Sequence, residues 1–477
     1  MSLTRALAHS TLIQLGGKLV STLLGLAAIA LMTRYLGVEQ FGWYVTATGF
    51  LQFVGLVADG GFTITTSALL AEPTFDRRRV LNTCFSWRLI SATVFQGAAP
   101  LLILAFPYPK EVKQAVAILT LAFFAIALSQ VFIGYFREQL KLKIVMGAEI
   151  LGRLLLLLGI AFSLVARQQF TAIMVAVTVA ALGSALILAY CARPLRFCFD
   201  RSISRALWHK MWPTALAVVA TAVYLQGDRV ILPLFADQTT VGLYGASYRI
   251  VEVVIQLAAM IMGTVMPLVA HAWSRHLTAE FQRRAQLGFD LINLLLWPAV
   301  AGLIAIAPGV LTFVAGKEFA PGAWMLQGLS LSLLGVAGGM IFGHYALAIG
   351  RQTTALLIYG SDALLSLIGY FIFIPRYGVA GAIGVTIGSE LYAGAGLALL
   401  CARASGWRPR LTTLLKIILA SGAMGGAIYA LQPLPLILSL GLGGLLYGLL
   451  ALLLRTISPA TLREVFAPAA IAPPNNA

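Results

Sequence analysis

Apolar runs of about twenty residues follow one another along almost the whole chain and limit its fold more than any other feature. They cover residues 11–33, 41–69, 84–106, 114–136, 144–166, 171–193, 213–235, 241–266, 289–313, 322–349, 353–374, 379–401, 414–431 and 435–454. A hydrocarbon layer of ~30 Å needs about twenty helical residues. Lipid offers no partner to an unpaired backbone group, so such runs must be helices. The sequence predicts an all-α polytopic membrane protein with 14 transmembrane helices.

Composition excludes the soluble classes of protein. Of the 477 residues, 60% are hydrophobic and only 10% are charged, whereas soluble domains carry about 25% charged residues. The net charge of +16 comes mainly from residues between the apolar runs, which suits loops facing anionic lipid and not a nucleic-acid surface. The four cysteines have no zinc-site spacing. We therefore expect no metal, no cofactor and no nucleic-acid partner.

Basic residues gather in alternate loops and predict the orientation. With the N-terminus inside, the inner loops include the basic segments 77–79, 137–143 and 193–210. The outer loops are short and hold few Lys or Arg, so the positive-inside rule puts both termini in the cytoplasm. Two inner linkers, 202–212 and 273–289, mix Trp or Leu with basic residues at helical spacing, and we expect them to lie on the inner leaflet.

A local pattern occurs twice, about two hundred residues apart. Gly42 and Tyr44 follow a polar turn and begin a long helix, and Gly242 and Tyr244 do the same. Six helices separate the copies, so both enter the membrane in the same direction, as in a parallel repeat. We predict two six-helix lobes around a central cavity and an extra C-terminal helix pair. The predicted units are residues 1–201, residues 202–405, the helix pair 406–466 and a disordered Pro-rich tail 467–477.

Several charged residues fall inside the predicted spans. A charge at the centre of a membrane helix costs about 2.5–3.5 kcal/mol or more, so it usually faces protein or a water-filled cavity. The cations are Lys18, Arg88, Arg153 and Arg249, and the acids are Asp59, Glu149, Asp228, Glu252, Asp362 and Glu390. Because guanidinium and ammonium groups suit multidentate binding of phosphate, the four cations are candidates for contact with a diphosphate.

Counting 1.5 Å per residue gives each charge in the first half a depth. Lys18 and Asp59 come out level, so they can pair or share a cavity wall. Glu149 and Arg153 are four residues apart on one helix face and can form a self-contained pair. Arg88 lies near the start of its helix, where its side chain can also extend to the membrane surface. Each has both a structural and a substrate-binding interpretation.

The second half carries a similar set. Asp228 and Arg249 come out level on consecutive helices, and Glu252 lies about one turn beyond Arg249. These three form either a structural network or part of the cavity wall. Asp362 and Glu390 fall near the middle of their helices, where they can couple an ion or hold a partner.

Short motifs at the helix ends resemble one known family. They are Arg34-Tyr35-Leu36-Gly37, Phe41-Gly42-Trp43-Tyr44, Asp59-Gly60-Gly61, Asp228-Arg229, Val241-Gly242-Leu243-Tyr244, Met266-Pro267 and Tyr377-Gly378-Val379-Ala380-Gly381-Ala382. Over residues 1–405 the chain resembles the Wzx-type O-antigen and exopolysaccharide flippases of the multidrug/oligosaccharidyl-lipid/polysaccharide exporter superfamily. The resemblance implies two six-helix lobes, alternating access and a cationic cavity for a polyprenyl-diphosphate-linked oligosaccharide.

The expected function is therefore a flippase of the bacterial inner membrane, not an enzyme. It would act as a monomer, together with membrane lipid and the polysaccharide polymerase or export machinery, and be driven by the membrane potential or by H⁺ or Na⁺ through Asp59, Asp362 or Glu390. The nearest alternative is a cation or drug antiporter of the same superfamily. A glycan polymerase or ligase is a third possibility, but it needs a sizeable outer loop, and the predicted outer loops are short.

Overall fold

The computed structural model describes residues 3–72, 74–139, 141–431 and 434–456, and these residues form helices and no strands. The α-helices are α1 (Leu3–Asp59), α2 (Phe62–Ala71), α3 (Arg77–Leu102), α4 (Lys110–Glu138), α5 (Leu142–Val165), α6 (Phe170–Cys191), α7 (Arg201–Phe235), α8 (Gln238–Ser274), α9 (Thr278–Val314), α10 (Ala323–Ala348), α11 (Gln352–Tyr377), α12 (Val379–Ser405), α13 (Leu411–Ala430) and α14 (Leu436–Leu453). Two short 3₁₀ helices lie at Ile103–Ala105 and Lys317–Gly322. The tail predicted at 467–477 lies outside the described residues.

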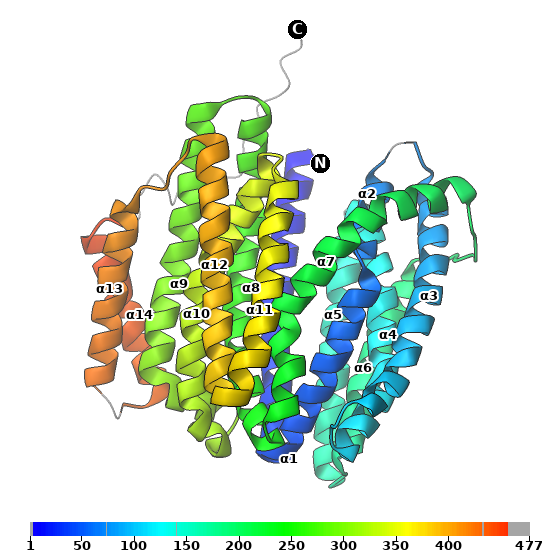
Figure 1. The fold of residues 1–477 in the computed structure, drawn as a ribbon, viewed down its shortest axis with the longest axis horizontal. Coiled ribbons are helices and arrows are strands. Elements are labelled where there is room, and N and C mark those ends of the chain that lie inside the picture. The colour runs from blue at the N-terminus through cyan, green and yellow to red at the C-terminus, as the bar shows by residue number, and fades with distance from the viewer. Residues whose placement is uncertain (1–2, 73, 140, 432–433, 457–477) are drawn as a thin grey trace.

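Thirteen of these helices are long and apolar enough to cross a membrane, and the first crosses it twice. Gly37 interrupts α1 with φ 69° and ψ −177°, a backbone conformation that a side chain disfavours. At this point the chain reverses direction, at the lower end of the molecule in Figure 1. Counting α1 twice gives fourteen passes, which confirms the predicted all-α polytopic fold. We call this end of the molecule the Gly37 end, and the opposite end the N-terminal end.

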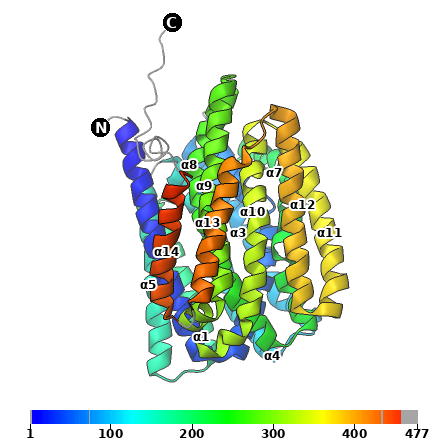
Figure 2. The same cartoon turned by 90° about the vertical axis from the view of Figure 1, so that its left-hand side faces the viewer.

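The helices pack as two groups that converge toward the Gly37 end (Figure 1). In the first group, α1 packs on α4 and α5, which both contact α6, and α3 packs on α4. In the second group, α10 packs against α8, α9 and α12, and α11 packs on α12. The last two helices, α13 and α14, lie along α9 at the edge of the second group (Figure 2).

Contacts of α1 with α7 and α8 join the two groups near the Gly37 end. The Thr46 hydroxyl donates to the side-chain oxygen of Gln238 at 2.8 Å, and the Arg34 guanidinium donates to the carbonyl of Phe313 at 2.7 Å. Both contacts lie close to the turn at Gly37. The groups are therefore closed against each other at this end.

Helix α7 belongs to both groups. Near its start, Ile203 and Leu207 are buried among side chains of α2 to α6. Farther along, Tyr224 stacks on Tyr359 of α11 with ring centres 5.8 Å apart. The segments predicted to lie on the inner leaflet, 202–212 and 273–289, are mostly the starts of α7 and α9, continuous with the spans. The lobe boundary at residue 201 remains a prediction, and α7 crosses from one group to the other.

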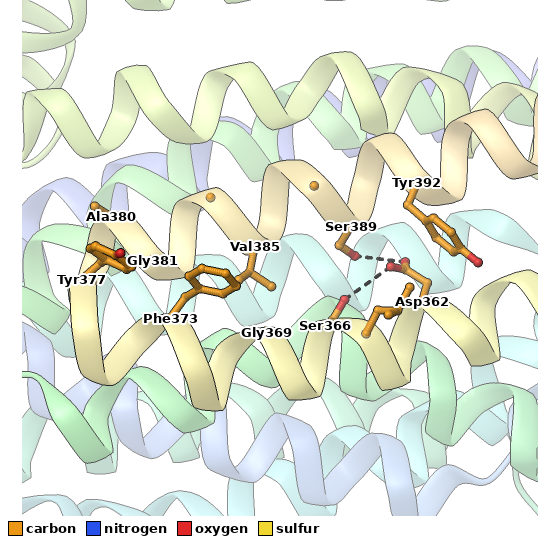
Figure 3. A pocket seen from close by; sticks show the side chains of 13 residues that line it. Asp362, Ser366, Gly369, Phe373, Tyr377, Ala380, Gly381, Val385, Ser389 and Tyr392 are labelled. Atoms are coloured by element: carbon orange, nitrogen blue, oxygen red, sulfur yellow. Dashed lines mark hydrogen bonds between the residues drawn. The ribbon is translucent and has the colours of Figure 1, made fainter.

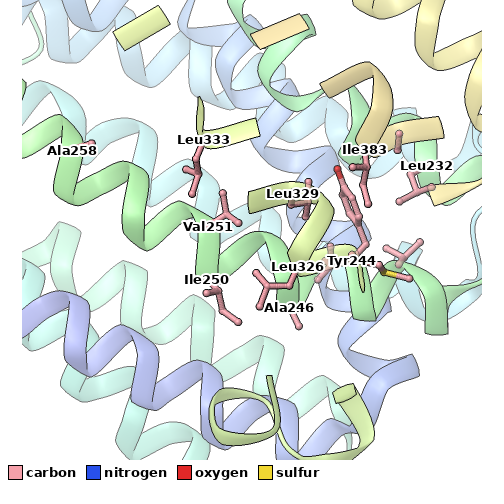
Figure 4. Close-up of a cluster of buried hydrophobic side chains, with 14 of the residues drawn as sticks. Leu232, Tyr244, Ala246, Ile250, Val251, Ala258, Leu326, Leu329, Leu333 and Ile383 are labelled. Carbon is pink, nitrogen blue, oxygen red and sulfur yellow. The ribbon is translucent and has the colours of Figure 1, made fainter. Parts of the chain in front are cut away.

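Side chains of α7, α8, α10 and α12 form the apolar centre of the second group (Figure 4). Tyr244 is buried with Leu326 and Leu329, and Ile383 of α12 and Leu232 of α7 complete this part of the cluster. Lipid tails are as apolar as these side chains, so close packing and not exclusion from water stabilises such a core.

A side chain compensates for a proline inside α9. Pro308 has no N–H, and its ring collides with the carbonyl four residues earlier, which belongs to Ile304. The helix deforms at Ile306, with φ −119° and ψ 18°. Gln327 of α10 donates its side-chain amide to the freed carbonyl of Ile304 at 2.9 Å. The freed carbonyl thus keeps a protein partner, as the breaks of membrane helices require.

Candidate functional site

The first intramembrane ion pair lies at the break between α1 and α2. Arg88 of α3 approaches Asp59 at 2.9 Å, and its guanidinium is only 4% exposed. The same group donates to the backbone carbonyl of Ala127 at 3.2 Å. Asp59 also accepts from the Thr63 hydroxyl at 2.6 Å and from the Thr63 backbone N–H at 3.3 Å, at the start of α2. Arg88 is therefore occupied by protein atoms inside the first helix group.

A second cluster joins α1 to α5. The Lys18 ammonium lies 2.9 Å from Glu149, and Ser21 donates to the same carboxylate oxygen at 2.8 Å. Arg153, one turn further along α5, is exposed and lies over Gly25, where an added Cβ would stand 3.5 Å from its guanidinium carbon. Among the described residues, Arg153 has no ion-pair partner. The contact between α1 and α5, which we call the α1–α5 seam, therefore carries two cations and one carboxylate.

A third network lies where the two groups meet. Glu252 of α8 binds both Arg249, at 2.9 Å, and Arg229 of α7. The Arg229 guanidinium lies 4.1 Å from the ring centre of Tyr248, in cation–π geometry, and donates to Gln52 of α1 at 3.4 Å. Two guanidinium groups share one carboxylate, so the network keeps one positive charge in excess. Through Gln52 it also links the first group to the second.

A small cavity adjoins this network. It holds about 20 Å³ between α1, α7 and α8, and Arg229, Arg249 and Gly49 line it. That volume accommodates about one water molecule. The arginines thus lie in a nearly closed part of the interface between the groups.

Asp228 is the neighbour of Arg229 in sequence but belongs to a different, acidic set inside the second group. It accepts from the Tyr244 hydroxyl at 2.5 Å, while its other oxygen has no hydrogen-bond partner. Glu390 of α12 is buried and has no hydrogen bond among the described residues. Asp228, Glu390 and Asp362 are close enough to interact electrostatically. No three His, Cys, Asp or Glu side chains in the described part of the chain converge as metal ligands do.

Asp362 lies in a groove between α11 and α12, toward the end opposite Tyr377 (Figure 3). It accepts from Ser389 at 3.0 Å and from Ser366 at 3.4 Å, and it is fully buried. The groove has a volume of about 590 Å³ and continues past Phe373 to Tyr377 along mainly apolar side chains and glycines. Asp362 and its two serine partners therefore form a polar part of the groove away from Tyr377.

The structure pairs these charges differently from their predicted depths. Of the two alternatives for Lys18 and Asp59, the direct pair is not formed, because Lys18 faces α5 and bonds Glu149, whereas Asp59 faces α3 and bonds Arg88. The self-contained Glu149–Arg153 pair is not formed, since Lys18 takes the carboxylate.

In the second half, Asp228 and Arg249, which were expected to be level, do not bond: Asp228 accepts from Tyr244 and Arg249 pairs with Glu252. Arg229, which was not among the predicted site residues, stands next to Asp228 and contacts Glu252. Its position inside a predicted span was the available signal.

The family profile described as "Polysaccharide biosynthesis protein" matches residues 7–273, more than half of the chain. The chain belongs to this family. Within the polysaccharide biosynthesis protein family, the matched segment includes the first helix group, all of α7 and most of α8. The clusters around Arg88, Lys18 and Glu252 all lie inside it.

A curated relative and two solved structures are also similar. A "probable low-salt glycan biosynthesis flippase" of Haloferax volcanii, Agl15, is 23% identical over 186 residues, which is 38% of each chain. The lipid II flippase MurJ, in an inward closed conformation, is 14% identical and superposes with a TM-score of 0.77 over 92% of this chain and 98% of its own. An inward-facing MATE multidrug transporter is 17% identical, with a TM-score of 0.67 over 81% and 95%. These likenesses show the MurJ/MATE-like fold.

Proposed function

We propose that this polysaccharide biosynthesis protein is a flippase, which moves a polyprenyl-diphosphate-linked oligosaccharide across the bacterial inner membrane by alternating access. The observation that carries the proposal is the surplus of cations at the helix interfaces. Arg229 and Arg249 share one carboxylate, and Lys18 and Arg153 accompany another. Excess positive charge in a low-dielectric site suits a diphosphate. The family membership and the flippase relative support the same class of substrate.

Lys18, Arg153 and Arg249 are the proposed diphosphate contacts. Each is partly or fully exposed, unlike Arg88, whose donors point to Asp59 and Ala127. Arg88 therefore supports the site by fixing α3 against the α1–α2 break. The head group would cross between the two helix groups while the prenyl chain stays in lipid. No covalent step is required of the protein.

The membrane potential can supply part of the driving force. With the cytoplasm negative, outward movement of a dianion is downhill by roughly 4.6 kcal/mol per 100 mV, twice the value for one charge. The acidic set of Asp228, Asp362 and Glu390 supplies the second candidate drive, in which a proton or Na⁺ moves inward. Support for a proton comes from Glu390, which has no hydrogen-bond partner among the described residues.

A cation or drug antiporter is the second candidate. The acidic set inside the second helix group and the likeness to a MATE transporter favour it. The arginine-rich interface favours the anionic substrate instead, because a cation would meet the excess charge of Arg229 and Arg249.

Proteoliposomes separate the two candidates. A lipid-linked oligosaccharide carrying a reducible fluorophore is distributed over both leaflets, so an external impermeant reductant quenches about half of it without flipping. With the active protein, we expect nearly complete quenching. Quenching that stays at one half, together with uptake of an organic cation, would contradict the flippase proposal and favour the antiporter.

A further inference from the structure

The chain between α6 and α7 forms a built element at one edge of the first helix group. We call residues 195–212 the strap. Its extended part runs along α3, where the backbone N–H of Arg196 donates to Asn82 at 3.2 Å and that of Cys198 donates to Ser86 at 3.0 Å. Two extended residues and four helical residues rise by about the same distance, so the bonds stay in step. Non-helical backbone within a membrane needs such partners.

The helical part of the strap has two unlike faces. Ile203 and Leu207 are buried against the first group. Arg201, Arg205, Trp208 and Trp212 are exposed, and their spacing of four, three and four residues places them on one stripe. In the extended part, the exposed side chains include Phe197 and Phe199.

Contacts with α3 place the strap at the depth of the membrane interface. Trp87 donates its ring N–H to the Ser204 hydroxyl at 3.0 Å. Its ring centre lies 5.4 Å from that of Trp208 and 5.5 Å from that of Phe199, in edge-to-face geometry. Trp87 is ten residues, or about 15 Å, from Arg77 at the start of α3, near the beginning of the apolar run at 84–106. Trp and Phe side chains exposed at this level are typical of the boundary between head groups and acyl chains.

The charge of the strap is strongly positive. Its exposed basic side chains are Arg196, Arg201, Arg205, His209 and Lys210. The acidic groups nearby are Glu72, which bonds Lys210, and Asp200, whose pKa is lowered by the hydroxyl of Ser202 and by backbone N–H groups. Arg201 and Arg205 have no ion-pair partner among the described residues. Two guanidinium groups are thus available next to two exposed indoles.

We propose that the strap binds the head groups of anionic phospholipids in the leaflet at the N-terminal end of the molecule. The guanidinium groups of Arg201 and Arg205 would contact lipid phosphates, and Trp208 and Trp212 would insert among the upper acyl chains. Anionic surface charge attracts such residues, and the apolar stripe adds buried area. Because the helical part of the strap is the start of α7, lipid bound there would hold this helix against the first group.

Native mass spectrometry of the purified full chain with phosphatidylglycerol or phosphatidylcholine tests the proposal. R201Q/R205Q should bind phosphatidylglycerol about five-fold more weakly for each arginine removed, or about 25-fold in total. Its binding of phosphatidylcholine should change less than two-fold. R201K/R205K, which keeps both charges, should bind phosphatidylglycerol nearly as well as the parent chain.

The matched control is R351Q/R403Q, which removes two exposed arginines at the same end of the second group. It should retain the parent affinity. Parent-like binding by R201Q/R205Q, or an equal loss in the control, would overturn the proposal. If the lysine variant also loses binding, the arginines act through packing and the head-group site is rejected.

Discussion

Gly42 of α1 and Gly242 of α8, the equivalent positions of the two repeats, lie against each other where these helices cross. A Cβ added at Gly42 would stand 1.8 Å from the carbonyl oxygen of Gln238, and one at Gly242 would stand 2.1 Å from that of Val38. Each glycine meets the carbonyl four residues before its counterpart. The repeated Gly-x-Tyr pattern therefore marks a place where the backbones of the two halves come into close contact.

Alanine at Gly42 should force this contact apart. The obstructing atoms belong to backbone, so we expect G42A to destabilise the closed form by about 1–3 kcal/mol or more. Thermal unfolding in detergent and spin-label distances across the Gly37 end measure the effect. In G263A, on the same α8, the new Cβ meets nothing within 4 Å, and the change should be neutral or stabilising. Equal behaviour of the two variants would contradict this account.

Arg249 and Glu252 should respond differently to substitution. R249A leaves Glu252 paired with Arg229, so we expect a folded protein with at least ten-fold slower glycan flipping. E252Q leaves two guanidinium groups without their carboxylate and should destabilise the fold by about 3–5 kcal/mol. Flipping in proteoliposomes and thermal unfolding separate these outcomes. An R249A variant that flips at the parent rate would remove Arg249 from the substrate path.

Arg88 and Asp59 should behave as a structural pair. Removing either partner leaves a buried charge, so R88A and D59A should each lose about 3–5 kcal/mol of stability, whereas R88L/D59L should lose less than the two losses together. The measurement is a double-mutant cycle of thermal unfolding. If R88A is as stable as the parent but fails to flip glycan, Arg88 contacts substrate directly, as the sequence-based prediction had it.

Arg153 offers the complementary test. It has no ion-pair partner among the described residues, so R153A should leave the unfolding temperature unchanged and slow flipping several-fold. K18A should slow flipping too, but with some loss of stability, because it strips Glu149 of its cation. R351A, an exposed arginine at the N-terminal end of the second group, serves as the control. Normal flipping in both R153A and K18A would exclude the α1–α5 seam as a binding surface.

Glu390 should connect transport to an ion gradient. E390Q replaces a buried carboxyl group, which can bind and release a proton beside Asp362 and Asp228, with an amide that cannot. We expect flipping by E390Q to proceed under a membrane potential but to lose its acceleration by a pH gradient. S366A, which removes one hydroxyl from Asp362, should keep most of the acceleration. Acceleration by the pH gradient that persists in E390Q, D362N and D228N would exclude the acidic set as the route of a coupling proton.

The positions of the membrane-spanning helices could be predicted from the sequence because hydrophobic length is a local property. All fourteen predicted runs overlap observed helices, and the local pattern that occurs twice in the sequence places Gly42 and Gly242 at equivalent positions of the two repeats. The partners of the charged residues could not be predicted in the same way. Counting residues gives the depth of a charged side chain along its helix. Its partner also depends on the rotation of that helix about its axis and on which helices lie beside it.

Lys18 shows this limit. It is level with Asp59 by residue count, but its side of α1 faces α5, so Glu149 and not Asp59 is its partner. Arg229 shows another. Arg229 directly follows Asp228 in the sequence, yet the two side chains bond to different partners, Glu252 and Tyr244 respectively. Only the packing of α7 between α1, α8 and α11 separates them.

The strap also implies an order in which segments of the protein fold during synthesis. Asn82 and Ser86 must already be in place before the backbone of residues 196–198 finds its hydrogen-bond partners, and Ile203 and Leu207 then close the apolar surface left by the earlier helices. During synthesis, the first six helices therefore remain an unfinished unit until the start of the seventh has emerged from the ribosome. A chain truncated after residue 192 would expose this apolar surface, whereas one that ends after residue 212 would cover it.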